Sequence, residues 1–317
     1  MSWALSEVDK VEVLTLQDNY VDLVVMDDTP VIHRARPLKD GELKNSILAE
    51  HGFSAVVSVQ RGQEVRSALF DFGFSEDGAA LNSETLDQDM SRVEVCALSH
   101  GHPDHVGGLK RLAEKVGKRG IQLVLHPAAF TRPRYIKVMG DFKVYFPPFT
   151  VESAQDAGAE VITTSNPYLL LGGTLLYLGE IPRRTKFEKG MPNAYCEDAG
   201  QEKWDPIPDD TALVAHIKGK GLVVLSGCAH SGIVNTVTYA KEVTGVDKVH
   251  VVMGGFHLTG PAFEGVIEPT IQALKKLDPD YVIPTHCTGR QPIMRIEQEM
   301  PDKFILNMAG TRLTFAA

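Results

Sequence analysis

A short segment between residues 97 and 109 places four side chains that can bind metals within six positions. These are His100, His102, Asp104 and His105, in the sequence SHGHPDH, and they follow directly on an apolar run. Neutral imidazoles and a carboxylate are donors that suit zinc, and also iron or manganese. The alternative is a polar turn with incidental histidines. We disfavour it because three of the eleven histidines share this turn with an acid.

The neighbouring elements predict how these side chains are positioned. Residues 93–99 have the composition of a buried strand, and His100 and His102 are two apart, so both can point to one side as the strand becomes a loop. Asp104 is placed to cap a helix, because apolar residues follow at helical spacing as far as Val116. We therefore expect the ligand groups to converge at a strand–loop–helix turn.

Three further histidines follow predicted strands in the second half of the chain. His230 and His286 each come directly after a buried run, and we predict both as metal ligands, with a polar helix cap as the alternative. For His257, after VVMGGF, three roles stay open: a ligand, a proton donor or an oxyanion partner. Asp104 and His257 are the predicted catalytic groups. Cys228 could bind metal as a thiolate, but we favour a small buried thiol that fills a tight turn.

These motifs resemble those of the metallo-β-lactamase superfamily. SHGHPDH is similar to its H-x-H-x-D-H signature, LFDFG to its strand ending in D-x-G, and THCTG to its late strand-end histidine. The second of these motifs would place Asp71 behind the metal site. At the strand end where the superfamily usually has an aspartate that bridges two metals, this chain has Cys228 and His230 instead.

The combination of motifs resembles one branch of that superfamily. LFDFG, LSHGHPDHVGG, LGEIPR, LSGCAHSGIVNTV, GGFHL and THCTG occur in this order between residues 69 and 289. Together they are similar to the dihydropterin–ribofuranosylaminobenzene 5′-phosphate synthases and their bacterial relatives. The resemblance identifies the branch but not the substrate.

The resemblance implies two sets of metal ligands, with zinc as the expected metal and iron, manganese or magnesium as alternatives. The first set is His100, His102 and His230, and the second set is Asp104, His105 and His286. Asp71 would orient a ligand imidazole through its free N–H. Because the bridging aspartate is missing, we expect one tightly held ion and a second, weaker one.

A basic loop in LGEIPRRTK is the predicted substrate-binding element. Glu180 and Arg183 would belong to it, together with Arg184 and Lys186. A bidentate guanidinium suits phosphate. The alternative is a solvated ion pair in a loop.

The resemblance also implies an α/β fold, a four-layer αββα sandwich with two mixed β-sheets. We expect a single domain over residues 1–317, with an irregular insertion at about 127–160. The local patterns predict a strand at 22–26 and a hairpin formed by 54–60 and 65–73.

Composition narrows the class of partner. The net charge of −9 argues against nucleic acid, and no apolar run reaches the roughly 18 residues of a membrane helix. The N-terminus lacks a signal-peptide pattern, so we expect a cytoplasmic protein whose four scattered cysteines are reduced thiols. The expected partner is a small anionic substrate, with homo-oligomerisation left open.

Three functions fit these observations. A bound metal lowers the pKa of water from ~15.7 towards ~7, which would serve a hydrolase. In a synthase-like transferase, the metals would instead stabilise pyrophosphate as it leaves a pterin methylene while the aryl partner attacks, with formation of a C–N bond. The third reading is a non-catalytic metal-binding or sensor protein. No G-x-S-x-G or G-x-G-x-x-G pattern competes with these readings.

Overall fold

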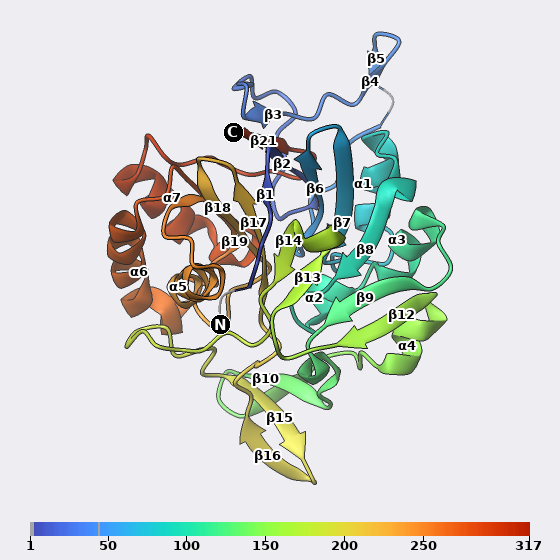
Figure 1. The fold of residues 1–317 in the computed structure, drawn as a ribbon. Helices are drawn as coiled ribbons and strands as arrows, with labels where there is room; N and C mark the ends of the chain where they lie inside the picture. Colours follow the sequence, from blue (N-terminus) through green and yellow to red (C-terminus); the bar gives the residue numbers. More distant parts are fainter. Residues whose placement is uncertain (1–2, 44) are drawn as a thin grey trace.

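Two large mixed sheets form the centre of the computed structural model, which describes residues 3–43 and 45–317 (Figure 1). The eight-stranded sheet has the order β12 (Ala159–Thr163), β9 (Ile121–Leu125), β8 (Val93–Ala97), β7 (Glu64–Phe70), β6 (Ser54–Arg61), β2 (Lys10–Gln17), β21 (Arg312–Ala316) and β3 (Ile32–His33). The seven-stranded sheet has the order β13 (Tyr168–Leu170), β14 (Leu175–Tyr177), β17 (Ala212–Ile217), β18 (Gly221–Ser226), β19 (Val249–Gly255) and β20 (Tyr281–Thr285), with β1 (Glu7–Val8) beside β17.

The predicted hairpin is confirmed as β6 and β7. These strands pair antiparallel, with Arg61 opposite Glu64, so two residues form the turn. Gly62 has a φ of 60°, which a glycine adopts without the steric cost of a side chain. Beyond this hairpin the chain runs parallel, from β7 to β8, β9 and β12, and helices make the crossovers.

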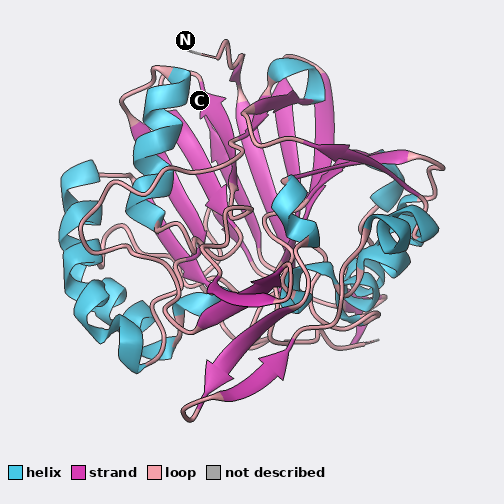
Figure 2. Cartoon of the chain, turned by 90° about the horizontal axis from the view of Figure 1, so that it is seen from below, coloured by secondary structure: helices cyan, strands magenta, loops and turns pink. Residues whose placement is uncertain are grey.

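Helices cover the outer face of each sheet (Figure 2). Those on the eight-stranded sheet are α1 (Gly78–Thr85), α3 (Leu109–Val116) and α4 (Val151–Asp156). Those on the seven-stranded sheet are α5 (Ile233–Thr244), α6 (Glu264–Leu277) and α7 (Arg290–Glu299). Short 3-10 turns occur at η1 (Met90–Arg92), η2 (Pro127–Phe130), η3 (Leu171–Gly173), η4 (Pro261–Phe263) and η5 (His286–Thr288). Within the described ranges, no helix has both the length and the apolar character needed to cross a membrane.

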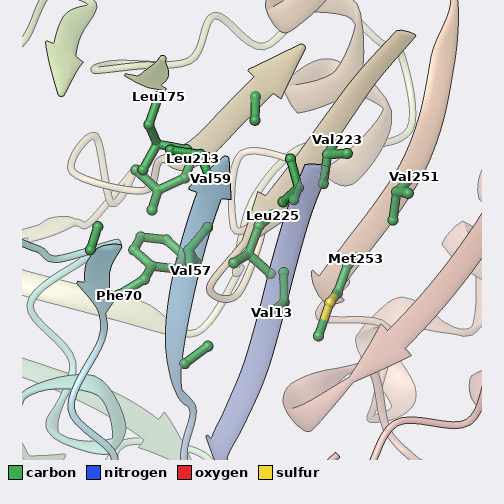
Figure 3. Close-up of a cluster of buried hydrophobic side chains, with 14 of the residues drawn as sticks. Val13, Val57, Val59, Phe70, Leu175, Leu213, Val223, Leu225, Val251 and Met253 are labelled. Carbon is green, nitrogen blue, oxygen red and sulfur yellow. The ribbon is translucent and has the colours of Figure 1, made fainter. Parts of the chain in front are cut away.

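The inner faces of the two sheets pack on each other through one apolar cluster (Figure 3). Val13, Val57 and Phe70 of the eight-stranded sheet meet Leu225 and Met253 of the seven-stranded sheet, and all five are buried. A strand that is buried on both faces needs apolar residues on both sides, which explains the apolar run of β18, whose six residues are all buried. The resulting order of helix, sheet, sheet and helix confirms the predicted four-layer sandwich.

Two segments differ from the local sequence predictions. Residues 22–26 form no strand, and Val24 and Met26 are exposed, because no neighbouring strand covers them. Residues 127–160, expected to be irregular, contain η2, α4 and a hairpin of β10 (Arg134–Val138) and β11 (Phe142–Tyr145). This hairpin joins a small sheet that projects from the sandwich (Figure 1), with the order β11, β10, β15 (Ala194–Asp198) and β16 (Gln201–Trp204). A further two-stranded ribbon is formed by β4 (Leu38–Lys39) and β5 (Glu42–Leu43).

Candidate metal centre

The loop after β8 and the short helix α2 (Pro103–Val106) carry the first four candidate ligands. His100, His102 and His105 are buried, and their rings lie together, with centroids 4.4 Å apart for His100–His102 and 4.3 Å apart for His100–His105. Asp104 lies between His102 and His105 in the first turn of α2. The contiguous motif therefore forms one cluster, as its spacing predicts.

The predicted capping role of Asp104 is wrong. His102 occupies the N-cap of α2, and the expected continuous helix is divided into α2 and α3 at Gly107 and Gly108. The division is explained by close packing, because a Cβ on Gly107 would lie 1.6 Å from the carbonyl oxygen of Phe74. The carboxylate of Asp104 is consequently directed toward histidine side chains, at 3.2 Å from His286 Nε2.

The other three histidines come from strand ends of the seven-stranded sheet. Strands β18, β19 and β20 are parallel, so their carboxyl ends meet at one edge. His230, His257 and His286 follow these ends in turn. The His230 ring lies 4.7 Å from that of His100 and 4.3 Å from that of His257, and the His286 ring lies 5.1 Å from that of His105. The sandwich thus brings segments more than a hundred residues apart into one site.

Strained backbone conformations mark these strand ends. Asp71, Ala229, His257 and His286 all have positive φ, between 44° and 59°. Such conformations are costly for residues with a side chain and concentrate at functional sites. Here the sharp bend after each strand turns the polar side chains toward the common edge.

Potential ligand atoms converge in three groups, and the members of each group lie within 4.8 Å of one another. The first group is Asp104, His105, Cys228 and His286, the second is His100, Cys228 and His230, and the third, Cys228, His257 and Cys287, holds one histidine and two thiols. His102 lies beside the second group, with its ring 4.9 Å from that of His230. We call His102 and the members of the first two groups the histidine cluster. These two groups follow the two ligand sets that the resemblance implies, with Cys228 in both.

The donor atoms fit a metal. Nε2 of His230 faces Nε2 of His100 at 3.1 Å, and the buried Nδ1 of His230 has no hydrogen-bond partner in the described chain. Burial lowers the pKa of His100 and His230 well below the usual value, and that of His102 to about 3. These rings are therefore neutral at physiological pH, which is the form that binds metal.

The group that contains Asp104 and His105 carries opposite charges when no metal is bound. Burial lowers the pKa of His105, but the charges of Asp71 and Asp104 outweigh it and raise this pKa to about 9. Burial raises the pKa of Asp104, but the positive charge of His105 and hydrogen bonds from His286 and His51 outweigh it and hold this pKa well below its usual range. A cation at this position would take the place of the imidazolium proton.

Asp71 supports the histidine cluster through contacts with His105 and Ser99. Its Oδ2 lies 2.6 Å from Nδ1 of His105, which leaves Nε2 of that ring directed into the site. Its Oδ1 accepts a hydrogen bond from the Ser99 amide at 2.7 Å, and the Ser99 hydroxyl donates to Oδ2. A buried carboxylate of this kind fixes the orientation and tautomer of an imidazole.

A network of buried ion pairs, which we call the arginine network, supports the His100–His102 loop. Arg134 donates to Asp205 at 2.7 Å and to both oxygens of Asp209, and Oδ2 of Asp209 accepts from the Gly101 amide at 2.8 Å. A Cβ on Gly101 would lie 2.0 Å from the carbonyl oxygen of Ala129, so the loop requires glycine there.

The predicted anion loop is only partly directed toward the site. Arg183 donates to the backbone carbonyls of Pro206 and His230, and Arg184 pairs with exposed Glu242. Glu180 is exposed, and its Oε2 lies 3.6 Å from His126 Nε2. Arg183 thus supports the backbone beside a candidate ligand, whereas Lys186 lines a cavity.

Two adjoining cavities open over these residues. One, of about 570 Å³, is lined by His102, Asp104, Cys228 and His230, together with Phe74, Phe146, Phe263 and others. The other, of about 590 Å³, is lined by Lys186, Lys189 and Trp204 among others. The cavities share Met191, Pro192, His230, His257, Ala262 and Phe263.

His51 is a site residue that none of the sequence motifs includes. Its Nε2 lies 3.3 Å from Asp104 Oδ2, and its ring lies 4.8 Å from that of His286. Asn19 contacts both histidines, through His51 Nδ1 at 3.1 Å and His286 Nδ1 at 2.9 Å. His51 precedes its strand instead of following one, so the strand-end pattern gave no signal for it.

Comparisons with known proteins agree with this geometry. The sequence model of the metallo-β-lactamase superfamily matches residues 52–175. A synthase of Methanocaldococcus jannaschii, named 7,8-dihydropterin-6-methyl-4-(β-D-ribofuranosyl)-aminobenzene-5′-phosphate synthase, is 30% identical over 275 residues, which are 84% of this chain and 90% of the synthase. An uncharacterized protein of the same organism is 30% identical over 271 residues, covering 82% of this chain and 93% of that protein.

Solved structures share the fold. Tm1679, described as a metal-dependent hydrolase of the β-lactamase superfamily, aligns with a TM-score of 0.72 at 24% identity, over 97% of this chain and 100% of that one. YhfI of Bacillus subtilis, described as a metallo-β-lactamase fold protein, aligns with a TM-score of 0.50 at 13% identity, over the same shares. The fold, the site and the relatives lead to one conclusion: this chain belongs to the metallo-β-lactamase superfamily.

Proposed function

We propose that the chain is a metal-dependent transferase of the synthase type, which joins a phosphorylated aminobenzene compound to a pterin methylene group. Its superfamily consists of metal-dependent enzymes, and the synthase named above supports transfer over hydrolysis. The observation that carries the proposal is the pair of adjoining cavities at the histidine cluster. Aromatic side chains line both cavities; the first also contains candidate ligands such as His102 and Asp104, and the second also contains Lys186 and Lys189.

The first cavity suits a flat heterocycle. Phe74, Phe146 and Phe263 line it, and aromatic side chains pack on planar rings by stacked or edge-to-face contact. The Phe146 ring also lies 4.9 Å from that of His102, so a ring held there would be next to the candidate metal ligands. A pterin bound in this cavity would present its methylene group to the histidine cluster.

The second cavity suits the phosphorylated partner. Lys186 and Lys189 line it, and neither forms an ion pair with a described residue. An ammonium group is a common phosphate ligand, and it attracts anions as a point charge. Because His230 and His257 line both cavities, the two substrates would meet beside these histidines.

The proposed reaction forms one bond and breaks one bond. The amine nitrogen bonds to the methylene carbon, the bond between that carbon and the pyrophosphate oxygen breaks, and the amine loses a proton. Bound divalent ions would stabilise the negative charge of the departing pyrophosphate. We assign to His257 the role of accepting the proton that the amine loses. His257 lines both cavities, and its buried Nδ1 has no hydrogen-bond partner among the described residues.

The direct test supplies both substrates to the metal-loaded protein. 4-(β-D-Ribofuranosyl)aminobenzene 5′-phosphate and the pyrophosphate of 6-hydroxymethyl-7,8-dihydropterin are incubated with it, and products are identified by mass spectrometry. We expect the coupled product and pyrophosphate, and neither after treatment with a chelator. Turnover of phosphodiester, lactone or thioester probes without any coupled product would favour the hydrolase. An absence of both activities in a metal-loaded sample would favour the non-catalytic reading.

The lysine cavity has its own test. Lys186→Ala combined with Lys189→Ala should raise KM for the phosphorylated acceptor on the order of 10-fold, since charge-assisted hydrogen bonds are lost. KM for the dephosphorylated acceptor should not change. Lys220→Ala is the matched control, because this residue lies in the turn between β17 and β18, at the opposite end of these strands. Equal effects on both acceptors would refute the assignment of the phosphate to this cavity.

A further inference from the structure

The first two groups of candidate ligands share a single residue, Cys228. Its Sγ lies within 4.8 Å of ligand atoms of Asp104, His105 and His286 on one side, and of His100 and His230 on the other. The distance from Sγ to His105 Nε2 is 3.1 Å. A donor atom in this position can reach an ion in either group.

We propose that Cys228 is a metal ligand, and that its sulfur bridges two divalent ions as a thiolate. Imidazoles contribute no negative charge, so Asp104 is the one carboxylate in the two groups. Two dications a few ångströms apart repel each other strongly, and a shared anion between them offsets part of that repulsion. The thiolate of Cys228 supplies this charge at the position where both ions need it.

The surroundings of Cys228 do not match those of a thiol that merely fills space. Cys96 lies within the apolar cluster beneath α3, whereas Cys228 belongs to none of the three apolar clusters of the core. The side chain is nevertheless buried, and its Sγ lies 3.1 Å from the imidazole Nε2 of His105. The geometry therefore favours the thiolate alternative over the space-filling role that the sequence suggested.

Close packing of glycines positions this sulfur. A Cβ on Gly227 would lie 2.1 Å from the Ser99 hydroxyl oxygen and 2.7 Å from Asp71 Oδ2. A Cβ on Gly255 would lie 3.2 Å from Cys228 Cα. Residues with side chains at these two positions would push the end of β18 away from the histidine loop, and the sulfur would no longer lie between the two groups.

Cys287 offers a matched control in the same site. It is also buried, and its Sγ lies 3.6 Å from the carbonyl oxygen of Cys228. It groups with Cys228 and His257, but it belongs to neither of the two groups described above. A ligand role for Cys228 thus predicts different results for two neighbouring thiols.

The test replaces the bound metal with cobalt(II), because a thiolate bound to cobalt gives a charge-transfer band in the near ultraviolet. Cobalt content is measured by elemental analysis and the band by absorption, in the parent, Cys228→Ser, Cys287→Ser and Cys228→Asp. Circular dichroism verifies the fold of each. These readouts do not depend on turnover, so they are separate from any failure of the proposed reaction.

We expect two cobalt ions and a thiolate band in the parent and in Cys287→Ser. Cys228→Ser should lose the band and about one ion, and Cys228→Asp should recover the second ion without the band. Absence of the band in the parent, or its persistence in Cys228→Ser, would overturn the proposal. If Cys228→Ser does not fold, Cys287→Ser still decides: a retained band assigns the thiolate to Cys228, and a lost band refutes that assignment.

Discussion

Two clusters of buried polar residues lie side by side in this protein, and they satisfy their polar atoms in opposite ways. In the arginine network, Arg134 is paired with Asp205 and Asp209, and Asp209 also accepts a backbone amide. In the histidine cluster, ring nitrogens face one another, and Nδ1 of His230 has no hydrogen-bond partner in the described chain. Buried polar atoms whose hydrogen bonds are all satisfied stabilise a fold. Buried donor atoms that converge and lack some hydrogen-bond partners are suited to binding a ligand.

The comparison also shows how one cluster depends on the other. The Asp209 carboxylate that pairs with Arg134 accepts the amide of Gly101, which stands between two candidate ligands. The paired network therefore fixes the loop of the unpaired cluster. Substitutions in the arginine network should reduce stability first, and substitutions in the histidine cluster should reduce metal binding first.

The largest effect is expected from Arg134→Ala. Its removal leaves Asp205 and Asp209 buried without their counter-charge, and breaking a buried pair in this way costs about 3–5 kcal/mol. The free energy of unfolding of the metal-free protein, measured by urea denaturation, tests this. Arg132→Ala is the control, because Arg132 is exposed and should change the value by less than about 0.5 kcal/mol. Equal effects of the two changes would contradict the division between the clusters.

His102→Ala should have the next largest effect, on metal content. The ring lies beside His100 and His230, and it is a predicted ligand in the set that they form, so metal content after dialysis should be well below that of the parent. Elemental analysis measures it. Without metal, His102→Ala should unfold at nearly the same urea concentration as the parent, whereas Arg134→Ala should unfold at a lower one. Exposed His33→Ala serves as the control, and unchanged metal content in His102→Ala would show that this ring is not a ligand.

Asp71→Asn should have a smaller effect on the same site. Asp71 contacts His105 and belongs to none of the groups of candidate ligands, and the loss of such a supporting carboxylate weakens metal affinity by about 10–100-fold. Competition with a chromophoric chelator measures the affinity. A loss as complete as that of His102→Ala would mean that Asp71 is itself a ligand or that the cluster has collapsed, and circular dichroism distinguishes these outcomes.

The smallest effect concerns acid stability. Burial raises the pKa of Asp209, but the charge and hydrogen bonds of Arg134 outweigh it and hold the pKa at about 2. Because this pKa is lower in the folded protein than the unfolded value near 3.8, the ionised carboxylate stabilises the fold by about 2 kcal/mol above pH 3.8. This stabilisation is lost as the pH decreases towards 2. The unfolding free energy of Asp209→Asn should therefore decrease less between pH 4 and pH 2 than that of the parent. If the unfolding free energies of the two proteins decrease equally between pH 4 and pH 2, the low pKa of Asp209 is refuted.

Much of the site could be predicted from the sequence, because its determinants are local. The four ligand candidates from His100 to His105 are contiguous, and His230 and His286 follow buried runs whose carboxyl ends meet in parallel sheets. The hairpin of β6 and β7 and the helical face of α3 also follow from periodicity along the chain. The motif order between residues 69 and 289 was enough to predict the fold.

The tertiary structure decided which side chains meet. His51 reaches Asp104, and Arg134 reaches Asp209, through contacts between segments that no periodicity relates. Cys228 lies in both ligand groups because β18 ends against the histidine loop, at a distance set by Gly227 and by the packing of one sheet on the other. A pattern along the chain reports which face of an element is buried, but the meeting of two side chains depends on where separate elements end in space.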